Sequence, residues 1–305
     1  MSNLAPKGDK DSKFSVVIPV YNEELSIATT LEHLEEILST AGCHYEIIVV
    51  NDGSTDKTGD IIDKIKGDIK DAPTFFRSFE HSRNLGYGAA LKTGIRHAKY
   101  PLIVITDADG TYPNEQIPHL VNLAQDYDMV VGARIGANVR YSNLRKIPKW
   151  FLVKFAQWVT KSYIPDLNSG LRVFPKKVVE RFFKIFPDNF SFTTTITIAM
   201  LANYYAVHYE PINYHHRVGK SKIQPIRDTL RFLQIVLRTG VYFAPMRVFM
   251  PVAALFFLGF LTTLCQDIFI RQDLTERTLI LLMTSTQLGM FALLADMIDK
   301  RSNIK

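Results

Sequence analysis

The segment FSVVIPVYNEE, residues 14–24, determines the predicted fold class. A mainly apolar run of strand length ends in a polar cluster, and leucines at helical spacing follow over residues 23–40. The same succession recurs along the chain. Strands are predicted for residues 14–20, 45–50, 74–79, 102–106 and 129–133, and helices for residues 23–40, 56–66, 87–98 and 114–126. This alternation predicts an α/β fold with an open, mostly parallel sheet that helices cover on both faces.

Polar clusters follow four of these strands directly. They are YNEE after the first strand, NDGSTD after the second, DADG after the fourth and GAR after the fifth. Ligands of open α/β sheets bind beyond the carboxyl ends of the strands. The sequence therefore predicts a ligand site at this edge of the sheet.

Asp107 and Asp109 stand one residue apart at the end of the fourth strand. Two carboxylates this close repel each other unless a positive charge lies between them. Mg²⁺ and Mn²⁺ take oxygen ligands, commonly one or two carboxylates together with substrate phosphates. The pair is either a solvated turn or a metal site. Its place beside the other ligand-like loops favours Mg²⁺ or Mn²⁺, which would neutralise a leaving diphosphate.

The NDGSTD loop places Asp52 where its carboxylate can accept a hydrogen bond from a nucleobase ring N–H. Residues 54–56 would equally cap the following helix. A Gly-x-Gly occurs at residues 86–88, but the full dinucleotide-binding pattern is absent and the position is not after the first strand. A dehydrogenase is therefore not expected. These glycines are expected to allow close helix–sheet packing or approach of the backbone to a phosphate.

Three further clusters hold charged residues. They are Arg134 in GAR, Asp166, Asn168, Ser169 and Arg172 in DLNSGLRVF, and His215, His216, Arg217, Lys220 and Lys222 in HHRVGKSK. The last cluster precedes a predicted amphipathic helix over residues 226–243, so we expect it where protein meets bilayer. Basic residues there can neutralise a lipid phosphate, and non-specific attraction to anionic lipid is the alternative.

Two uncharged stretches, residues 248–264 and 278–295, follow this helix. At about 1.5 Å per residue each reaches roughly 25–27 Å, close to the ~30 Å hydrocarbon core of a bilayer. They predict a transmembrane hairpin, and the basic flanks place both of its ends in the cytoplasm. A buried helical pair in a soluble core is the alternative. The predicted parts are a disordered lead without a signal peptide (1–13), a catalytic domain (14–222), an interfacial helix (223–245) and the hairpin (246–305), with helices at about 248–270 and 278–297.

The net charge of +6 over 305 residues favours anionic partners such as nucleotides, phosphates or acidic lipid. The basic residues cluster beside the apolar stretches, so a nucleic-acid partner is not expected. Cys43 and Cys265 fall in the polar and apolar parts, so no structural disulfide is expected, which suits a reducing compartment. Gly259 and Gly289 permit close helix contacts, which leaves a homo-oligomer open.

Taken together, IPVYNEE, VNDGSTDKT, NLGYGAALKTG, DADGTYP, NSGLRVF and RVGKSKI resemble the family 2 glycosyltransferases of the GT-A fold. More narrowly, they resemble the polyprenyl-phosphate glycosyltransferases, such as dolichyl-phosphate mannose synthases and bacterial undecaprenyl-phosphate glucosyl- and aminoarabinosyltransferases. The resemblance covers about residues 14–226, and the hairpin resembles that of the bacterial members. It implies a UDP- or GDP-linked sugar donor, an undecaprenyl or dolichyl phosphate acceptor, and Mg²⁺ or Mn²⁺. It also implies a multi-pass protein of the cytoplasmic (inner) membrane, with its catalytic domain facing the cytoplasm.

The resemblance also implies roles for individual residues. Nucleotide-sugar binding falls to Pro19, Tyr21, Glu23, Asp52, Asp107, Ala108 and Asp109. The residues that would bind the acceptor phosphate and the donor diphosphate are Arg134, Arg145, Arg217 and Lys220. The metal ligands would be Asp107 and Asp109. The catalytic residues would be Asp107, Asp109, Arg134 and Asp166. Thr111 stands where several relatives supply a glutamine as a third metal ligand. SFTTTITIAM (191–200) stands where the mannose synthases carry an arginine-containing stretch, so their sugar specificity does not transfer.

A lipid phosphate is already anionic near neutral pH, so it needs no strong general base. The predicted mechanism is in-line displacement with inversion, driven by positioning and by stabilisation of the leaving nucleoside diphosphate. One alternative is a family 2 enzyme that acts on a polysaccharide or protein, with Asp166 as a carboxylate base. Another is a non-catalytic, nucleotide-binding membrane scaffold.

Overall fold

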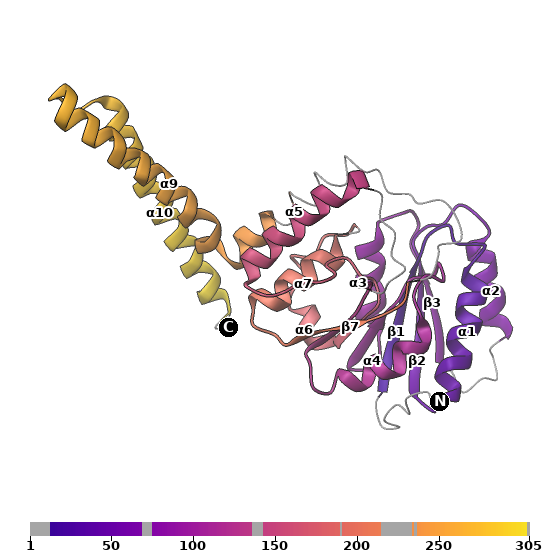
Figure 1. Cartoon of the computed structure of the whole chain (residues 1–305). Coiled ribbons are helices and arrows are strands. Elements are labelled where there is room, and N and C mark those ends of the chain that lie inside the picture. The colour runs from indigo at the N-terminus through magenta and orange to yellow at the C-terminus, as the bar shows by residue number, and fades with distance from the viewer. Residues whose placement is uncertain are drawn as a thin grey trace. The chain divides into compact units, whose positions relative to one another are not determined.

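A computed structural model of the chain describes residues 13–68, 75–135, 143–189, 191–214, 234 and 237–303 (Figure 1). The chain divides into two compact units. The first is assigned Met1–Lys149 and Ile164–Thr229, and the second Trp150–Tyr163 and Leu230–Lys305. The sequence-based boundaries differ, because they placed residues 150–163 in the catalytic domain. Residues 1–12 and most of the predicted interfacial helix lie outside the described residues, although residues 237–243 are helical.

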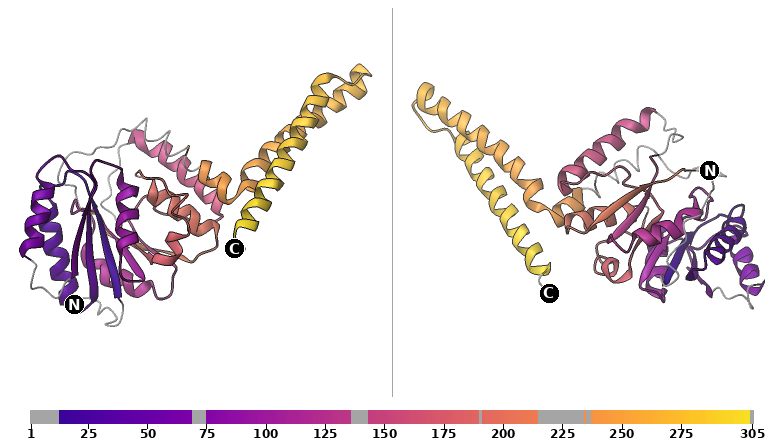
Figure 2. Two further views of the ribbon diagram at one scale, coloured as in Figure 1. Left: turned by 180° about the vertical axis from the view of Figure 1, so that it is seen from behind. Right: turned by 60° about the horizontal axis from the view of Figure 1, so that its bottom comes forward.

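A mixed sheet forms the centre of the first unit and has seven strands in the described part of the chain (Figures 1 and 2). They are β1 (Lys13–Val20), β2 (His44–Asn51), β3 (Phe75–Glu80), β4 (Leu102–Ile105), β5 (Met129–Ala133), β6 (Arg172–Pro175) and β7 (Val207–Pro211). Their order is β3-β2-β1-β4-β6-β5-β7. Only β6 runs antiparallel to its neighbours among these strands. The mostly parallel α/β fold and all five predicted strands are confirmed.

Helices cover both faces of this sheet, which explains why its central strands are apolar without alternation. On one face, Val16 and Val49 share a core with Leu34 of α1 (Ile27–Thr40). On the other face, Val17 lies so close to Gly94 of α3 (Tyr87–His97) that an added Cβ would be 2.3 Å from Val17 Cγ1. The other helices of this unit are α2 (Thr58–Asp68), η1 (Asn114–Gln116), α4 (Ile117–Leu123), α6 (Lys176–Glu180) and α7 (Phe192–Ala202).

Two strands (β6 and β7) and two helices (α6 and α7) that lie wholly in this unit have no counterpart in the sequence-based prediction. β6 has only four residues, and β7 is half-exposed and does not alternate clearly. α7 is buried on every side, so it lacks the polar face that marks an amphipathic helix. Its threonines bind other groups in the interior, as described below.

The second unit contains α5 (Asn143–Thr160) from Trp150 onward and a helical hairpin. The hairpin consists of α9 (Pro245–Gln266), a π-helical turn (Asp267–Arg271) and α10 (Glu276–Asn303). Residues 245–271 and 276–298 are long and apolar enough to cross a membrane, with mean hydropathies of 2.2 and 1.7, and only 11% of either apolar window is buried. A helical pair inside a soluble core would hide such side chains, whereas Leu258 and Phe291 are 59% and 64% exposed. These features confirm the predicted hairpin.

Side-chain hydrogen bonds join the two helices of the hairpin at the turn. Asp267 Oδ2 accepts hydrogen bonds from the backbone N–H of Thr275 (2.9 Å) and from the hydroxyls of Thr275 (2.7 Å) and Thr278 (2.6 Å). Farther along, a Cβ added at Gly259 would lie 3.8 Å from Leu281 of α10. Gly259 thus serves a contact within the hairpin, and the homo-oligomer stays a prediction.

Candidate active site

Asp109 is held by a tight turn shortly after β4. Its Oδ1 accepts hydrogen bonds from the backbone N–H (3.2 Å) and the hydroxyl (2.6 Å) of Thr111. Gly110 has a φ of +68°, a left-handed conformation that glycine adopts without strain. The carboxylate is therefore both buried and oriented, since Asp109 is 8% exposed. Thr111, considered above for a third metal ligand, directs its hydroxyl to Asp109.

Asp107 is oriented by groups from two distant parts of the sequence. The hydroxyl of Tyr87, at the start of α3, donates to its Oδ1 (3.0 Å). Gly170 lies against the same carboxylate, because a Cβ added there would be 2.9 Å from Oδ2 and 3.0 Å from Oδ1. The structure thus brings the NSGLRVF segment to the acidic pair, and a side chain at position 170 would displace Asp107.

Two tyrosines beside the acidic pair stay protonated, Tyr87 partly buried and Tyr112 buried. Burial raises the pKa of Tyr87 and Tyr112 well above the ordinary value, and the negative charge of Asp107 raises both further. Tyr87 therefore remains a hydrogen-bond donor to Asp107, and the oxygen of Tyr112 accepts from the backbone N–H of Gly170 (2.6 Å). Sequence reasoning missed both residues. Their one signal was their place inside NLGYGAALKTG and DADGTYP.

The donor set of this site fits a divalent cation. Asp107 and Asp109 supply two carboxylates at the carboxyl edge of the sheet, and no group of three or more His, Cys, Asp or Glu side chains gathers among the described residues. Mg²⁺ is commonly held by one or two carboxylates and by substrate phosphates, so two protein ligands suffice. Neighbouring side chains also orient both carboxylates, as the second shell of a metal site does.

The loops that follow β1 and β2 are joined into one surface. The backbone N–H of Asn22 donates to Ser54 Oγ (3.0 Å), and its side-chain oxygen accepts from the N–H of Thr55 (2.7 Å). The backbone N–H of Glu23 donates to Thr58 Oγ1 (3.0 Å). Of the residues predicted to bind nucleotide, Tyr21 and Glu23 are half-buried here, and Pro19 is buried within β1.

Asp52 is buried at this surface, and protein groups bind its carboxylate. It accepts hydrogen bonds from the backbone N–H of Leu85 (2.9 Å) and of Gly86 (2.8 Å). Its Oδ1 also lies 2.7 Å from Nδ1 of His81. Asp52 thus fixes the loop that leads into α3, and with it Tyr87. Its contact with a nucleobase stays a prediction.

The Gly-x-Gly of residues 86–88 marks a crossing of two backbones. A Cβ added at Gly86 would be 2.4 Å from the carbonyl oxygen of Asp188, and one at Gly88 would be 2.2 Å from that of Pro187. The N–H of Ala89 donates to Asp188 O (3.0 Å). The expected close packing of a helix on the sheet occurs instead at Gly94 of α3, which lies against Val17.

Arg134 and Asp166, both predicted as catalytic, form a buried ion pair. Arg134 donates from Nε (2.7 Å) and its backbone N (3.0 Å) to Oδ2, and from Nη2 (2.9 Å) to Oδ1. The side chains are 15% and 3% exposed. The N–H of Asn168 adds a further hydrogen bond to Oδ1 (3.1 Å). Both oxygens of Asp166 thus already accept hydrogen bonds from protein groups, which argues against a role as general base toward an acceptor.

Arg172 holds the same segment from inside. It is fully buried, and it donates to the carbonyls of Ser169 (2.7 Å) and Leu167 (3.0 Å) and to the hydroxyl of Thr197 on α7 (2.7 Å). Burial lowers the pKa of its guanidinium, although an arginine in a protein stays protonated. Arg134 and Arg172 thus fix both sides of the loop that carries Gly170 to Asp107.

Of the remaining predicted site residues, the structure fully describes only Ala108. Ala108 is buried between the two aspartates, and its carbonyl accepts a hydrogen bond from Thr30 Oγ1 of α1 (3.0 Å). Arg217 and Lys220 lie outside the described residues. The backbone of Arg145 belongs to α5, but its side chain is also outside the description.

Two family models match the chain. The model for glycosyl transferase family 2 matches residues 15–183, and the model for the GtrB C-terminal hairpin matches residues 244–300. The first match contains the acidic pair, Tyr87 and the Arg134–Asp166 ion pair. The second contains both apolar stretches.

Two curated relatives carry the same name. The chain is 31% identical over 237 residues to the undecaprenyl-phosphate 4-deoxy-4-formamido-L-arabinose transferase of Shewanella sediminis (strain HAW-EB3). The aligned region covers 76% of this chain and 68% of that protein. It is 30% identical over 260 residues to the protein of the same name from Pseudomonas fluorescens (strain Pf0-1), which covers 78% and 74%.

Solved structures share the fold. The glucosyl-3-phosphoglycerate synthase of Mycobacterium tuberculosis in complex with UDP has a TM-score of 0.55 at 16% identity, over 75% of this chain and 80% of that one. Its complex with Mn²⁺, UDP and glucosyl-3-phosphoglycerate has a TM-score of 0.54 at 17% identity, over 77% and 81%. These likenesses confirm the GT-A fold. The matched motifs, the sheet and the extent of the family match agree, and the chain belongs to glycosyltransferase family 2.

Proposed function

We propose that this glycosyltransferase moves a sugar from a nucleoside diphosphate sugar to the phosphate of a polyprenyl phosphate at a membrane. The observation that carries the proposal is the presence, in one chain, of an oriented pair of aspartates and an exposed apolar hairpin. The names of the relatives from Shewanella sediminis and Pseudomonas fluorescens support this acceptor class. They also favour undecaprenyl over dolichyl phosphate.

The reaction depends on positioning and charge more than on proton transfer. An oxygen of the lipid phosphate, anionic near neutral pH, attacks the anomeric carbon from the side opposite the diphosphate. The new carbon–oxygen bond forms as the bond to the diphosphate breaks, and the nucleoside diphosphate leaves with the electron pair, inverting that carbon. The enzyme must align the two phosphates and stabilise the charge on the leaving group.

A divalent cation would be held by Asp107 and Asp109. When bound, it would neutralise the charge that builds up on the leaving diphosphate. Tyr87 keeps Asp107 in place and Thr111 keeps Asp109 in place, so the pair is ordered before a ligand arrives. The Mycobacterium tuberculosis synthase was crystallised with Mn²⁺ or Mg²⁺ and UDP, which supports a divalent metal in general.

We assign the donor to the surface made by the loops after β1, β2 and β4. Tyr21 and Glu23 lie there, and Asp52 lies beneath it. The acceptor phosphate is assigned to the basic residues Arg145, Arg217 and Lys220, with Arg134 contributing its charge from within the ion pair. Pro19 and Ala108 complete the nucleotide-binding set.

A transferase that acts on a polysaccharide or protein hydroxyl is the second candidate. Such an acceptor must lose a proton, and a general base near the acceptor does this work. Asp166 was the candidate base, and its ion pair with Arg134 counts against that role. A non-catalytic scaffold would not require the orientation that Tyr87 and Thr111 impose on the acidic pair.

We place the protein in the cytoplasmic membrane with the catalytic unit on the cytoplasmic side. Arg238 and Arg247 precede the apolar part of α9, and Lys300 and Arg301 lie near the end of α10. Basic residues that flank membrane segments remain in the cytoplasm. The hairpin crosses twice, so both of its ends lie on that side.

The test is a donor screen with the purified full-length protein in detergent. Mg²⁺ or Mn²⁺, undecaprenyl phosphate and a panel of UDP- and GDP-sugars are supplied, and nucleoside diphosphate and glycolipid are both measured. We expect release with one donor that depends on the lipid. Asp109→Asn should reduce this release by about a hundredfold or more, as expected for loss of a group that stabilises the transition state. Asp63→Asn, on the exposed side of α2, is the matched control.

Binding of UDP or GDP without turnover for every donor would contradict the proposal. Release that needs a soluble saccharide instead of the lipid would favour the second candidate. Equal release by the Asp109→Asn variant would remove the acidic pair from the mechanism.

A further inference from the structure

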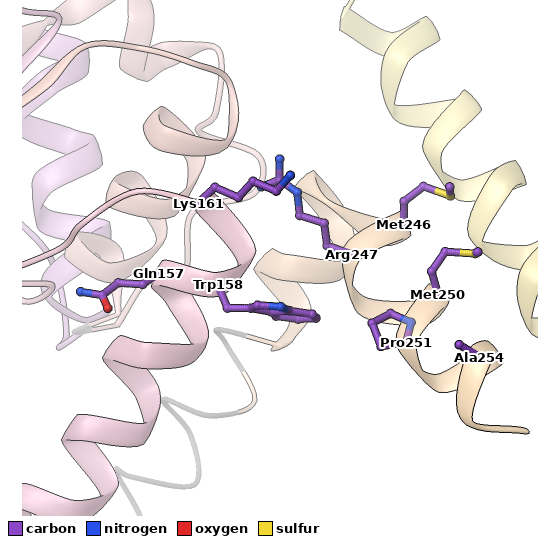
Figure 3. A pocket seen from close by; sticks show the side chains of 8 residues that line it. All are labelled: Gln157, Trp158, Lys161, Met246, Arg247, Met250, Pro251 and Ala254. Atoms are coloured by element: carbon purple, nitrogen blue, oxygen red, sulfur yellow. The ribbon is translucent and has the colours of Figure 1, made fainter. Parts of the chain in front are cut away.

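A groove of about 550 Å³ lies within the second unit, between the C-terminal half of α5 and the first turns of α9 (Figure 3). Its wall is largely apolar and contains Trp158, Met246, Met250 and Pro251. The ring of Trp158 points toward Pro251, whereas the side chains of Met246 and Met250 extend from α9 away from Trp158 (Figure 3). Trp158 and Met250 are 46% and 41% exposed. This surface fits a flexible hydrocarbon chain, because thioethers and an indole adapt to irregular apolar partners.

Two cations stand at one rim of the groove. The side chains of Lys161 and Arg247 extend toward each other there (Figure 3). Arg247 also donates a hydrogen bond to the carbonyl of Val159, which fixes its position. None of the described residues that line the groove is acidic. Two like charges that converge without a carboxylate between them favour an anion at that rim.

We infer that this groove binds one anionic phospholipid of the bilayer, with its phosphate between Lys161 and Arg247 and an acyl chain over Trp158, Met250 and Pro251. An anionic head joined to an apolar chain matches the charge at the rim and the apolar wall. The groove lies at the start of the first apolar span, the level at which a helix that crosses a bilayer meets the lipid head groups. This inference does not depend on the proposed reaction.

The residues of the groove distinguish this lipid from the acceptor. All of its lining residues belong to the second unit, whereas Asp107, Asp109 and the donor loops belong to the first. An acceptor phosphate has to reach the donor sugar, so its site requires residues of the first unit. A lipid that is bound but not consumed has no such requirement.

Lys161 offers a variant that removes the charge without harming the fold. It follows α5 directly with a φ of +55°, in the left-handed region where glycine is the usual residue. Lys161→Gly therefore deletes the ammonium group and relieves backbone strain at the same position. Lys154→Ala is the matched control, because Lys154 is exposed on the same helix and does not line the groove.

The two tryptophans of the chain make the groove directly observable. Trp150→Phe leaves Trp158 as the single tryptophan of the full-length protein, and excitation at the red edge of the indole band avoids its tyrosines. The variant is reconstituted into phosphatidylcholine vesicles that contain increasing fractions of dibrominated phosphatidylglycerol or dibrominated phosphatidylcholine, both of which quench indole on contact. We expect half-maximal quenching at about a fivefold lower fraction of the anionic lipid, the preference expected from one basic residue near a membrane surface. Lys161→Gly should reduce that preference to near unity, and Lys154→Ala should preserve it.

Several outcomes would overturn the inference. Equal quenching by the two lipids would show contact with the membrane without a site, and no quenching would show no contact. A preference that survives in Lys161→Gly would assign the anion to other groups. Unlabelled undecaprenyl phosphate that relieves the quenching better than unlabelled phosphatidylglycerol would make this the acceptor's groove. The Trp158→Phe variant, which reports from Trp150 outside the groove, should show no preference between the lipids.

Discussion

Gly170 provides the sharpest test of how the acidic pair is built. A methyl group at this position would lie 2.9 Å from Asp107 Oδ2 and 3.0 Å from Oδ1, whereas ordinary contacts begin at 3.4 Å. In Gly170→Ala the carboxylate must therefore retreat by about 0.5 Å, the difference between 2.9 and 3.4 Å. Misplacement of a catalytic group by 1 Å costs about a hundredfold in rate, so half that distance predicts a loss of about tenfold.

The assay is the initial rate of transfer as a function of Mg²⁺ and Mn²⁺ concentration. Mg²⁺ requires near-ideal octahedral geometry, so we expect a higher half-saturating Mg²⁺ concentration as well as a lower rate. The thermal midpoint should hardly change, because the backbone at Gly170 is not left-handed. Gly67→Ala on α2, where a Cβ meets open space, is the matched control. Wild-type rates and metal dependence in Gly170→Ala would refute the claim that Asp107 must occupy this position.

Three further predictions concern the residues around the acidic pair, and a fourth concerns the hairpin. Tyr87→Phe removes the donor to Asp107 and should lower kcat/KM by about tenfold or more in steady-state kinetics, since a hydrogen bond to a charged group contributes about 1.5–3 kcal/mol; unchanged kinetics would contradict this. Arg134→Met leaves the buried Asp166 unpaired and should destabilise the fold by about 3–5 kcal/mol in thermal unfolding, with partial recovery in the double variant Arg134→Met/Asp166→Leu. The pKa of Tyr112 is raised in the folded protein. The stability that this shift contributes is therefore complete below about pH 10 and is lost as the pH rises toward the raised value. In Tyr112→Phe the thermal midpoint should fall less steeply at alkaline pH. Deletion of residues 245–305 should greatly slow transfer to long-chain lipid phosphate in membranes, and a full rate would show that the hairpin is not needed.

Local sequence was enough to predict the first five strands and the acidic pair. β1, β2 and β4 are apolar runs that end in polar loops, and short-range patterns of this kind survive folding. Asp107 and Asp109 are neighbours in the chain, so their proximity did not depend on tertiary structure. The hairpin was equally clear, because length and hydropathy alone define it.

The groups that orient the acidic pair could not be found in this way. Tyr87 lies 20 residues from Asp107 in the sequence, and it reaches Asp107 only because α3 packs across the sheet. Gly170 reaches the same carboxylate from the loop between α5 and β6. The ion pair of Arg134 with Asp166 joins residues that lie 32 apart in the sequence. Each contact depends on long-range packing, about which residue type and spacing carry no information.

The position of β6 has a consequence for the order in which the catalytic unit assembles during synthesis. β5 pairs with β6 and β7, both of which follow it in the chain, and it does not pair with β4. The first four strands can therefore form a sheet and place Asp107 and Asp109 at its edge while β5 has no strand to join. The ion pair and the loop that carries Gly170 form only after β6 has been inserted between β4 and β5. The acidic pair and the groups that orient it from nearby, Tyr87 and Thr111, are thus supplied by the first part of the chain, whereas the contact of Gly170 with Asp107 is added only when the segment before β6 arrives.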